Sequence, residues 1–280
     1  MMPDRRLNAF RPDLADARLS GQVEAARFVE GVTMRVAAPL ASLRREPHTA
    51  AVQLSQALMG ETLRVFDVAD GWAFVQLDRD CYVGYADWTA LAEPAVAATH
   101  RVAVPLSFIY PKAGIKTQPA VAVSMNATVA VIGNEGGNAA IAGGGYVHAA
   151  HLKPIAETES DFVEVAERLL HAPYYWGGKS VGGIDCSGLV QLALEACGRA
   201  CPRDSDMQER DLGQSLQIND LDGLKRGDLA FWKGHVGLVQ GPDRLLHASG
   251  HHMQVVSESL REAVARIAAS ESAITRLKRL

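Results

Sequence analysis

The sequence predicts an α+β protein in which two small β barrels precede a domain that mixes helices with strands. Residues from about 25 to 155 form short runs of Val, Leu and Ala separated by Gly and Pro, a pattern typical of small antiparallel β modules. A weak internal repeat lies within this stretch. After about residue 157 the apolar residues recur at helical spacing. The architecture therefore changes about midway along the chain.

The internal repeat indicates two copies of one barrel. The segment Met-Gly-Glu-Thr-Leu-Arg-Val at 59–65 resembles Met-Asn-Ala-Thr-Val-Ala-Val at 125–131, and Tyr82-Val83 corresponds to Tyr146-Val147. This spacing fits barrels of roughly 60 residues. Prolines mark both joints, because proline lacks the backbone donor that a continuing strand needs. We expect an extension over residues 1–24, a first barrel over 25–93, a second barrel over 94–154 and a final domain over 155–280.

The final domain is predicted to begin with two helices. The first should end before Pro173 and has a capping-box signal at Thr158 and Asp161. Its apolar face consists of Phe162, Val165, Ala166, Leu169 and Leu170. The second helix is expected from Cys186 to Ala196, with Gly198 as its terminator.

Strands are predicted to follow over residues 228–232, 235–239 and 245–248. The triplet Gly241-Pro242-Asp243 is a turn signal between the last two. A helix over about residues 260–269 and a short final strand complete the α+β domain.

Composition argues against several functional classes. The net charge of −4 leaves no general basic surface for nucleic acid. The first twenty residues lack the apolar core of a secretory signal, and no stretch approaches the ~20 apolar residues of a membrane span. We therefore expect a cytoplasmic protein without a membrane span. The four cysteines show no paired spacing, which argues against a zinc site and a disulfide framework. The cysteine chemistry considered for Cys186 requires no metal or organic cofactor, and none is expected.

Cys186 is the candidate nucleophile. It follows Gly182-Gly183-Ile184-Asp185, which permits a sharp turn, and it opens the second predicted helix. Free backbone N–H groups and the positive end of the helix dipole should lower the pKa of its thiol and favour the thiolate. The alternative is that Cys186 is a small buried apolar residue, as many single cysteines are.

Two histidines are candidates for the base and its orienting partner. If the two strands pair about a turn centred on Gly241, facing residue numbers sum to 482, and His235 lies opposite His247. Opposed residues have Cβ atoms about 4.5–5.5 Å apart, within reach of a ring-to-ring hydrogen bond. One imidazole would take the thiol proton while the other orients it. A slip of one residue would separate the rings, and a surface or core role is the alternative for each histidine.

These motifs together resemble the NlpC-type cell-wall peptidases, which are papain-like enzymes. The resemblance covers about residues 157–280 and rests on five segments in order. They are Pro173-Tyr174-Tyr175-Trp176-Gly177-Gly178, Asp185-Cys186-Ser187-Gly188-Leu189-Val190, Arg226-Gly227-Asp228-Leu229, Gly234-His235-Val236-Gly237 and Leu246-His247-Ala248. The N-terminal half is similar to the paired bacterial SH3 barrels of the γ-D-glutamyl-L-diamino acid endopeptidase branch. That similarity rests on residues 71–75 and 82–85.

The resemblance implies roles for individual residues. Cys186, His235 and His247 would form the catalytic set, and Tyr174 would lie beside the nucleophile. Asp185 and Ser187 would contact a free N-terminal L-Ala, since a carboxylate in a closed pocket favours an ammonium over an acylated amine. Trp176 is a candidate pocket residue, and packing is its alternative.

Further residues are implied around this set. Glu61 and Tyr82 of the first barrel would complete the substrate pocket. The second repeat has Ala127 in place of Glu61. The alternative for Glu61 is a solvated turn residue. Cys81 stands where the family commonly has Gly. The segment containing Arg203, Asp204 and Gln208 would border the site, although Asp204 or Ser205 is also a good helix cap.

The implied reaction is hydrolysis of the γ-D-glutamyl–diamino acid bond in peptidoglycan stem peptides that carry a free N-terminal L-Ala. Without an export signal, the expected substrates are fragments taken up for recycling of the cell wall. Two alternatives stay open: an acyltransferase or amidase with the same Cys/His pair, and a non-catalytic binder of cell-wall peptides. The sequence does not distinguish meso-diaminopimelate from L-Lys as the diamino acid.

Overall fold

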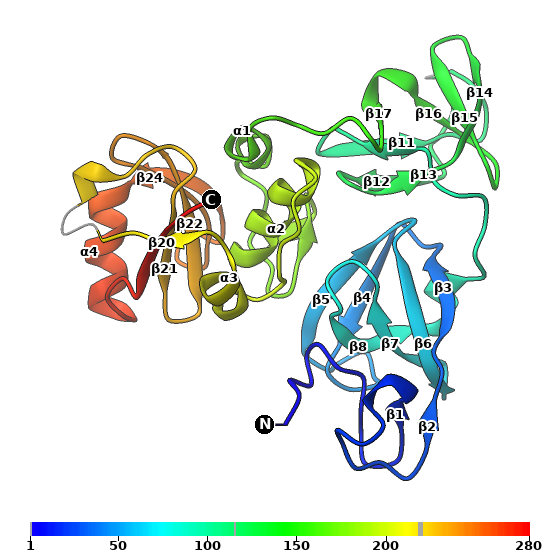
Figure 1. Cartoon of the computed structure of the whole chain (residues 1–280). Helices are drawn as coiled ribbons and strands as arrows, with labels where there is room; N and C mark the ends of the chain where they lie inside the picture. Colours follow the sequence, from blue (N-terminus) through cyan, green and yellow to red (C-terminus); the bar gives the residue numbers. More distant parts are fainter. Residues whose placement is uncertain (1, 115, 218–220) are drawn as a thin grey trace. The chain divides into compact units, whose positions relative to one another are not determined.

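The computed structural model describes residues 2–114, 116–217 and 221–280, which divide into two compact units. The first unit extends to Glu157 and the second begins at Thr158. The first is built almost entirely of strands, and the second combines helices with a sheet (Figure 1). The predicted α+β class with two N-terminal barrels is therefore confirmed.

The first barrel is a curled sheet of seven strands in the order β5-β4-β8-β7-β6-β3-β9, with all neighbours antiparallel. Side chains such as Leu43, Leu63 and Val75 alternate inward along these strands and are fully buried. The bounds are β3 (Val32–Val36), β4 (Leu40–Arg44), β5 (Gln53–Leu58), β6 (Thr62–Ala69), β7 (Trp72–Leu77), β8 (Val83–Asp87) and β9 (Leu91–Ala92).

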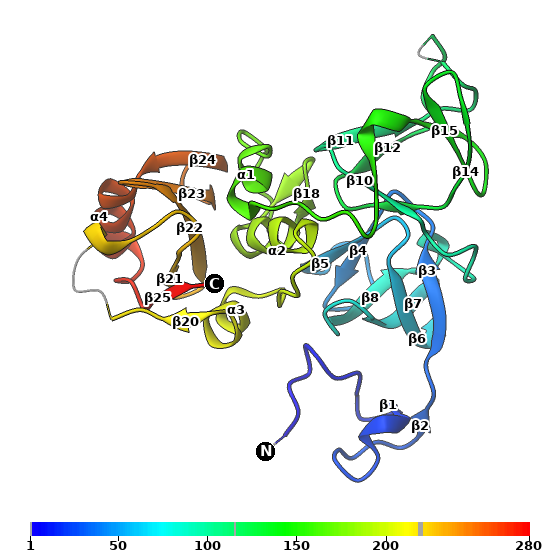
Figure 2. The same ribbon diagram turned by 45° about the horizontal axis from the view of Figure 1, so that its top comes forward.

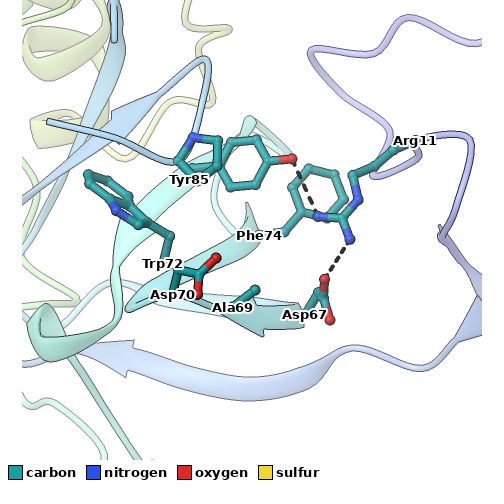
Figure 3. A pocket seen from close by; sticks show the side chains of 8 residues that line it. Arg11, Asp67, Ala69, Asp70, Trp72, Phe74 and Tyr85 are labelled. Atoms are coloured by element: carbon teal, nitrogen blue, oxygen red, sulfur yellow. Dashed lines mark hydrogen bonds and ion pairs between the residues drawn. The ribbon is translucent and has the colours of Figure 1, made fainter. Parts of the chain in front are cut away.

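The N-terminal extension packs on this barrel. Its strand β1 (Ala15–Asp16) pairs in parallel with β2 (Phe28–Val29). Leu14 is buried in a cluster with Phe66 and Phe74 of the barrel. The Arg11 guanidinium lies 5.0 Å from the centre of the Phe74 ring and donates to Tyr85 and to Asp67, at the edge of a shallow pocket (Figure 3). Cation–π and ionic contacts thus reinforce the apolar packing.

The second barrel has three small antiparallel sheets around one core. Val102, Val123 and Val147 are buried in this core together with Leu58 of the first barrel. Its sheets are β13-β10-β17, β11-β12 and β14-β15-β16. The bounds are β10 (His100–Val102), β11 (Leu106–Ile109), β12 (Val121–Ser124), β13 (Thr128–Val129), β14 (Val131–Glu135), β15 (Asn138–Ile141), β16 (Tyr146–His148) and β17 (Leu152–Pro154).

The predicted repeat corresponds to a shared turn. Gly60 and Asn126 occupy equivalent positions with φ of 85° and 66°. The Gly60 N–H donates to the Val36 carbonyl at 2.9 Å, and the Asn126 N–H donates to the Val102 carbonyl at 2.9 Å. The left-handed region favours Gly and, among other residues, Asn, which explains both choices.

The second unit contains a six-stranded antiparallel sheet in the order β20-β25-β21-β22-β23-β24. Helix α4 covers one face, while α1 and α2 lie on the other (Figures 1 and 2). The strands are β20 (Gln214–Ser215), β21 (Leu229–Trp232), β22 (His235–Gly241), β23 (Arg244–Ser249), β24 (Gln254–Ser259) and β25 (Arg276–Arg279), with a separate hairpin of β18 (Lys179–Ser180) and β19 (Gly183–Ile184). The helices are α1 (Phe162–Glu167), α2 (Cys186–Ala196), α3 (Ser205–Asp211) and α4 (Leu260–Ser270).

Helix α1 differs from its prediction at both ends. Asp161 itself is the N-cap, because its carboxylate accepts from the Val163 N–H at 2.8 Å and the Glu164 N–H at 3.3 Å. The capping box that begins at Thr158 is therefore wrong. The helix ends at Glu167, and Leu169 is buried in the turn that follows rather than in the helix.

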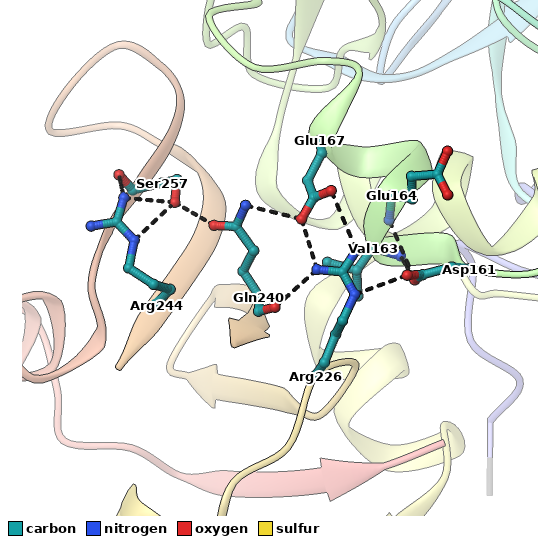
Figure 4. Close-up of polar contacts among 8 residues, drawn as sticks. All are labelled: Asp161, Val163, Glu164, Glu167, Arg226, Gln240, Arg244 and Ser257. Carbon is teal, nitrogen blue, oxygen red and sulfur yellow. Dashed lines mark hydrogen bonds and ion pairs between the residues drawn. The ribbon is translucent and has the colours of Figure 1, made fainter. Parts of the chain in front are cut away.

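Arg226 connects α1 to the sheet through ion pairs and a hydrogen bond. Its guanidinium lies 2.8 Å from Asp161 Oδ2 and 2.7 Å from Glu167 Oε1, and it also donates to the Gln240 carbonyl. The Gln240 side chain continues the network to Ser257 on β24 (Figure 4). These contacts join the first helix of the unit to β22 and β24.

Candidate active site

Cys186 is the first residue of α2, as the sequence predicts. Asp185 is its N-cap, and Oδ1 of Asp185 accepts from the Gly188 N–H at 2.7 Å. The Cys186 side chain is buried beside the start of β22, where the Val236 backbone N–H donates to the sulfur. The N-terminus of α2 and the start of β22 therefore both lie beside the Cys186 thiol.

The expected lowering of the thiol pKa is wrong. Burial and, to a smaller extent, the adjacent Asp185 carboxylate raise the pKa of Cys186 to about 12. Donation from the Val236 and Ser187 N–H groups and the nearby Arg203 lower it, but by less. The helix N-terminus is thus outweighed by the loss of hydration that a thiolate requires. Burial therefore favours the neutral thiol over the thiolate.

The two histidines meet as predicted, through a different register. Nε2 of His235 lies 2.7 Å from Nδ1 of His247. The ladder pairs Leu238 with Leu246 and Val239 with Leu245, so facing numbers sum to 484 rather than 482. The predicted register is wrong for two reasons. The turn is the dipeptide Pro242-Asp243, with Asp243 at φ 50°, which pairs Gly241 with Arg244, and a bulge between Val239 and Gly241 then changes the facing sum from 485 to 484.

Burial keeps both histidines neutral. The pKa of His235 is lowered to about 3, first by loss of hydration and then by the nearby His247. Loss of hydration also lowers the pKa of His247, against the opposing effect of Glu258. Trp232 faces His235 across the β21–β22 hairpin, with the ring centres 5.6 Å apart, and excludes water from that side.

Glu258 and Arg266 extend this chain of contacts, and neither was predicted. Oε1 of Glu258 lies 2.7 Å from Nε2 of His247, and the Arg266 guanidinium donates to the same oxygen. Burial alone would raise the pKa of Glu258, but the hydrogen bonds from His247 and Arg266 hold it at about 2. The sequence offered a signal in Gln254–Ser259, whose two valines are typical of a strand, but the pairing of β24 with β23 was needed to place Glu258.

Asp185 is already engaged by several donors. Arg203 forms a bidentate pair with it, at 2.9 Å to Oδ1 and 2.7 Å to Oδ2, and both side chains are buried. The Gly177 N–H donates to Oδ2 at 2.9 Å, and the Ser187 hydroxyl donates to Oδ1 at 3.3 Å. Asp185 therefore organises the start of α2, and its contact with a substrate amine stays a prediction.

The segment around Arg203 lies directly behind this helix start. Nε2 of Gln208 donates to the Ser187 carbonyl at 2.9 Å and to the Pro202 carbonyl at 2.8 Å. Arg203 also donates to the Ser187 hydroxyl at 2.9 Å. Asp204 occupies the N-cap position of α3 without a capping hydrogen bond from its side chain. Arg203 and Gln208 thus support the backbone that carries Cys186.

Tyr174 and Trp176 differ in burial. Burial raises the pKa of the Tyr174 phenol, and the nearby Cys186 also raises it. Tyr174 forms a parallel bridge with Ile184, two residues before Cys186. Its backbone N–H donates to the Met253 carbonyl at 2.9 Å. The Trp176 side chain is largely exposed at 62%. The Tyr174 backbone is therefore held close to the start of α2, while Trp176 presents an aromatic surface.

Glu61 and Tyr82 are buried in the first unit. Oε1 of Glu61 lies 3.5 Å from Nε of Arg79, so Glu61 is not a solvated turn residue. The Tyr82 N–H donates to Oδ1 of Asp80 at 3.0 Å. Cys81 has φ 61°, the left-handed conformation that glycine adopts without strain. The backbone shape that a glycine would give is therefore kept. The substrate roles of Glu61 and Tyr82 stay predictions.

The described residues offer no candidate metal site and no candidate membrane-spanning helix. No group of three or more His, Cys, Asp and Glu side chains there is arranged to hold a metal ion. In the same part of the chain, no helix has the length and apolar character needed to cross a membrane.

Comparisons with known proteins match both units. Residues 171–269 match the NlpC/P60 family, and residues 43–91 match the bacterial dipeptidyl-peptidase SH3 domain. The chain is 36% identical over 126 residues to dipeptidyl-peptidase 6 of Lysinibacillus sphaericus, covering 42% of this chain and 45% of that relative. It is 28% identical over 218 residues to the γ-D-glutamyl-L-lysine dipeptidyl-peptidase of Bacillus subtilis, covering 69% and 71%.

A solved structure shows the same fold. The crystal structure of an NlpC/P60 family protein from Bacillus cereus superposes with a TM-score of 0.74 at 18% identity, covering 89% of this chain and 99% of that one. The chain therefore contains an NlpC/P60 domain preceded by SH3-like barrels.

Proposed function

We propose that this protein is a cysteine endopeptidase that hydrolyses the γ-D-glutamyl–diamino acid bond of peptidoglycan stem peptides. The observation that carries the proposal is that the Cys186 sulfur, at the start of α2, accepts from the N–H of Val236, the neighbour of His235 at the start of β22, while His235 contacts His247 on β23. A sulfur nucleophile, a base and a group that orients the base are the parts that acyl transfer to water needs.

The neutral resting state defines the first step. His235 takes the thiol proton as the Cys186 sulfur attacks the γ-carbonyl of D-Glu, so the ion pair forms only along the reaction path. His235 then protonates the leaving amine, and water hydrolyses the thioester, with the proton passing back through His235. Backbone N–H groups at the start of α2 and the Tyr174 phenol are suitable donors to the oxyanion.

The substrate assignment draws on the relatives. One of them is named as a γ-D-glutamyl-L-lysine dipeptidyl-peptidase, which supports the same bond here. We further propose that the substrate carries a free N-terminal L-Ala and that the enzyme acts on fragments recycled in the cytoplasm.

The test is to incubate the purified full chain with L-Ala-γ-D-Glu-diaminopimelate and with its N-acetylated form, and to identify products by mass spectrometry. A Cys186→Ala variant is the control. Release of L-Ala-γ-D-Glu from the free peptide alone supports the proposal. Equal cleavage of both peptides contradicts the requirement for a free amine and favours an amidase. Transfer of the acyl group to an added amine favours an acyltransferase, and binding without turnover favours a peptide binder.

A further inference from the structure

We propose that Glu258 is a positioning residue that sets the tautomers of His247 and His235, and that Arg266 holds Glu258 in place for this purpose. The inference rests on the proposed function for its kinetic consequence, but the tautomers themselves can be measured without any substrate. Neither residue belongs to the motifs that carry the family resemblance.

The sheet brings these residues to one face. His247 pairs with Val256 and Leu245 pairs with Glu258, so Glu258 is the diagonal neighbour of His247 on the adjacent strand. Leu245 belongs to the core cluster that α4 covers. A side chain of α4 can therefore reach Glu258, and the Arg266 guanidinium does so.

The hydrogen bonds have only one consistent direction when both rings are neutral. Ionised Glu258 can only accept, so Nε2 of His247 must carry the proton and donate across the 2.7 Å contact. Nδ1 of neutral His247 is then an acceptor, and Nε2 of His235 must donate to it, again across 2.7 Å. Nδ1 of His235 is left without a proton. Glu258 thus makes Nδ1 the basic atom of His235.

The charges around His235 act in opposite directions once its ring is protonated. When His235 takes the proton of Cys186 at Nδ1, the Glu258 carboxylate favours the positive charge, whereas His247 and the Arg266 guanidinium oppose it more strongly, so Glu258 acts on His235 mainly by orienting the rings. Arg266 keeps this carboxylate ionised and fixes its Oε1 atom. His252 is the other titratable group facing it, with Nε2 3.5 Å from Oε1 and a side chain 36% exposed. The buried, directional partner is therefore His247.

The test compares Glu258→Gln with the wild type by two measurements. The first is kcat and KM on L-Ala-γ-D-Glu-diaminopimelate. The glutamine side chain keeps the shape but can donate as well as accept, so we expect kcat to fall by roughly 10- to 100-fold with KM changed less than about threefold. The second is the ¹⁵N chemical shift of the ring nitrogens. In the wild type at neutral pH, Nε2 of both His235 and His247 should be protonated, and Glu258→Gln should mix the tautomers.

Further variants separate positioning from folding. Glu262→Gln makes the same change on the exposed surface of α4 and should alter neither measurement. Glu258→Asp, which keeps the charge, should recover part of kcat, and Arg266→Gln should lower kcat less than Glu258→Gln does. Wild-type kcat in Glu258→Gln, or wild-type His247 protonated at Nδ1, would overturn the inference. If the wild type cleaves no peptide, the proposed function fails, and the ring shifts still decide this inference.

Discussion

Gly237 lies opposite His247 on the neighbouring strand, and a Cβ atom on Gly237 would come within 3.3 Å of the His247 Cβ. The same atom would approach Leu245 Cδ1 to 2.8 Å. This crowding explains how His247 makes its contact with His235. His235 is two residues from Gly237 on the same face, so the rings meet diagonally over a position that has no side chain.

Gly237→Ala should therefore damage the site more than the fold. The methyl group would push His247 and Leu245 away from β22, at a cost of about 1–3 kcal/mol in the free energy of unfolding. We expect kcat to fall at least tenfold because the His235–His247 contact lengthens. Gly241→Ala on the same strand is the control, since its Cβ meets nothing within 4 Å. Equal kcat values for the two variants would contradict the role of Gly237.

These relationships show what the sequence could predict. The bounds of α2 follow from local signals, namely the Asp185 cap, the apolar stripe and the terminator Gly198 at φ 71°. The histidine register required both the length of the turn, where Asp243 has a positive φ, and the bulge between Val239 and Gly241, which the local pattern does not reveal. The error was two residues, an even number, so both rings kept the same face of the sheet.

Other features depend on contacts between distant segments. Glu258 could be assigned only once β24 was paired with β23. The buried state of Cys186 arises from packing against β22 and reverses the pKa shift that the helix start alone suggests. The local pattern therefore correctly placed Cys186 at the start of a helix but gave the wrong direction for its pKa shift.

The reactivity of Cys186 toward iodoacetamide should increase continuously with pH. Its pKa of about 12 means that the thiolate fraction grows about tenfold per pH unit between pH 6 and 9.5. A preformed thiolate–imidazolium pair would instead give a plateau near neutral pH. Mass spectrometry of labelled peptides gives the rate, and exposed Cys81 in the same sample is the internal reference. A plateau at neutral pH would contradict the neutral resting state.

Acid should destabilise the second unit through its buried histidines. The unfolded chain takes up a proton on His235 below its usual pKa of 6.5, whereas the folded pKa is about 3. The contribution of His235 to the free energy of unfolding is therefore complete above pH 6.5. It is lost as the pH falls toward 3, by up to about 1.4 kcal/mol per pH unit. His235→Gln should flatten the dependence between pH 6.5 and 5, as measured by urea unfolding. His251→Gln, at an exposed position, should leave it unchanged.

Asp185→Ala should unfold or strongly destabilise the second unit rather than simply relax specificity. The change leaves Arg203 buried without its bidentate partner and removes the cap of α2. Breaking such a buried pair costs about 3–5 kcal/mol. Arg203→Met should be similarly destabilising, whereas Arg210→Met, which removes an exposed ion pair with Asp211, should cost less than about 1 kcal/mol. Thermal unfolding measures all three. An Asp185→Ala protein of wild-type stability would contradict the structural role of the carboxylate.

Cys81→Gly should stabilise the first unit. Cys81 is held at φ 61° by a turn in which its carbonyl accepts from Gln76 and the Tyr82 N–H donates to Asp80. A residue with a Cβ in this conformation is strained by roughly 1–2 kcal/mol, and Cys81→Gly relieves this strain. The relief is partly offset because glycine increases the conformational entropy of the unfolded chain. The net increase in unfolding free energy should be about 0.5–1 kcal/mol. Cys81→Ala removes the thiol but keeps the strain, so it should show no such gain. A stabilisation shared by both variants would trace the effect to the thiol and not to the backbone.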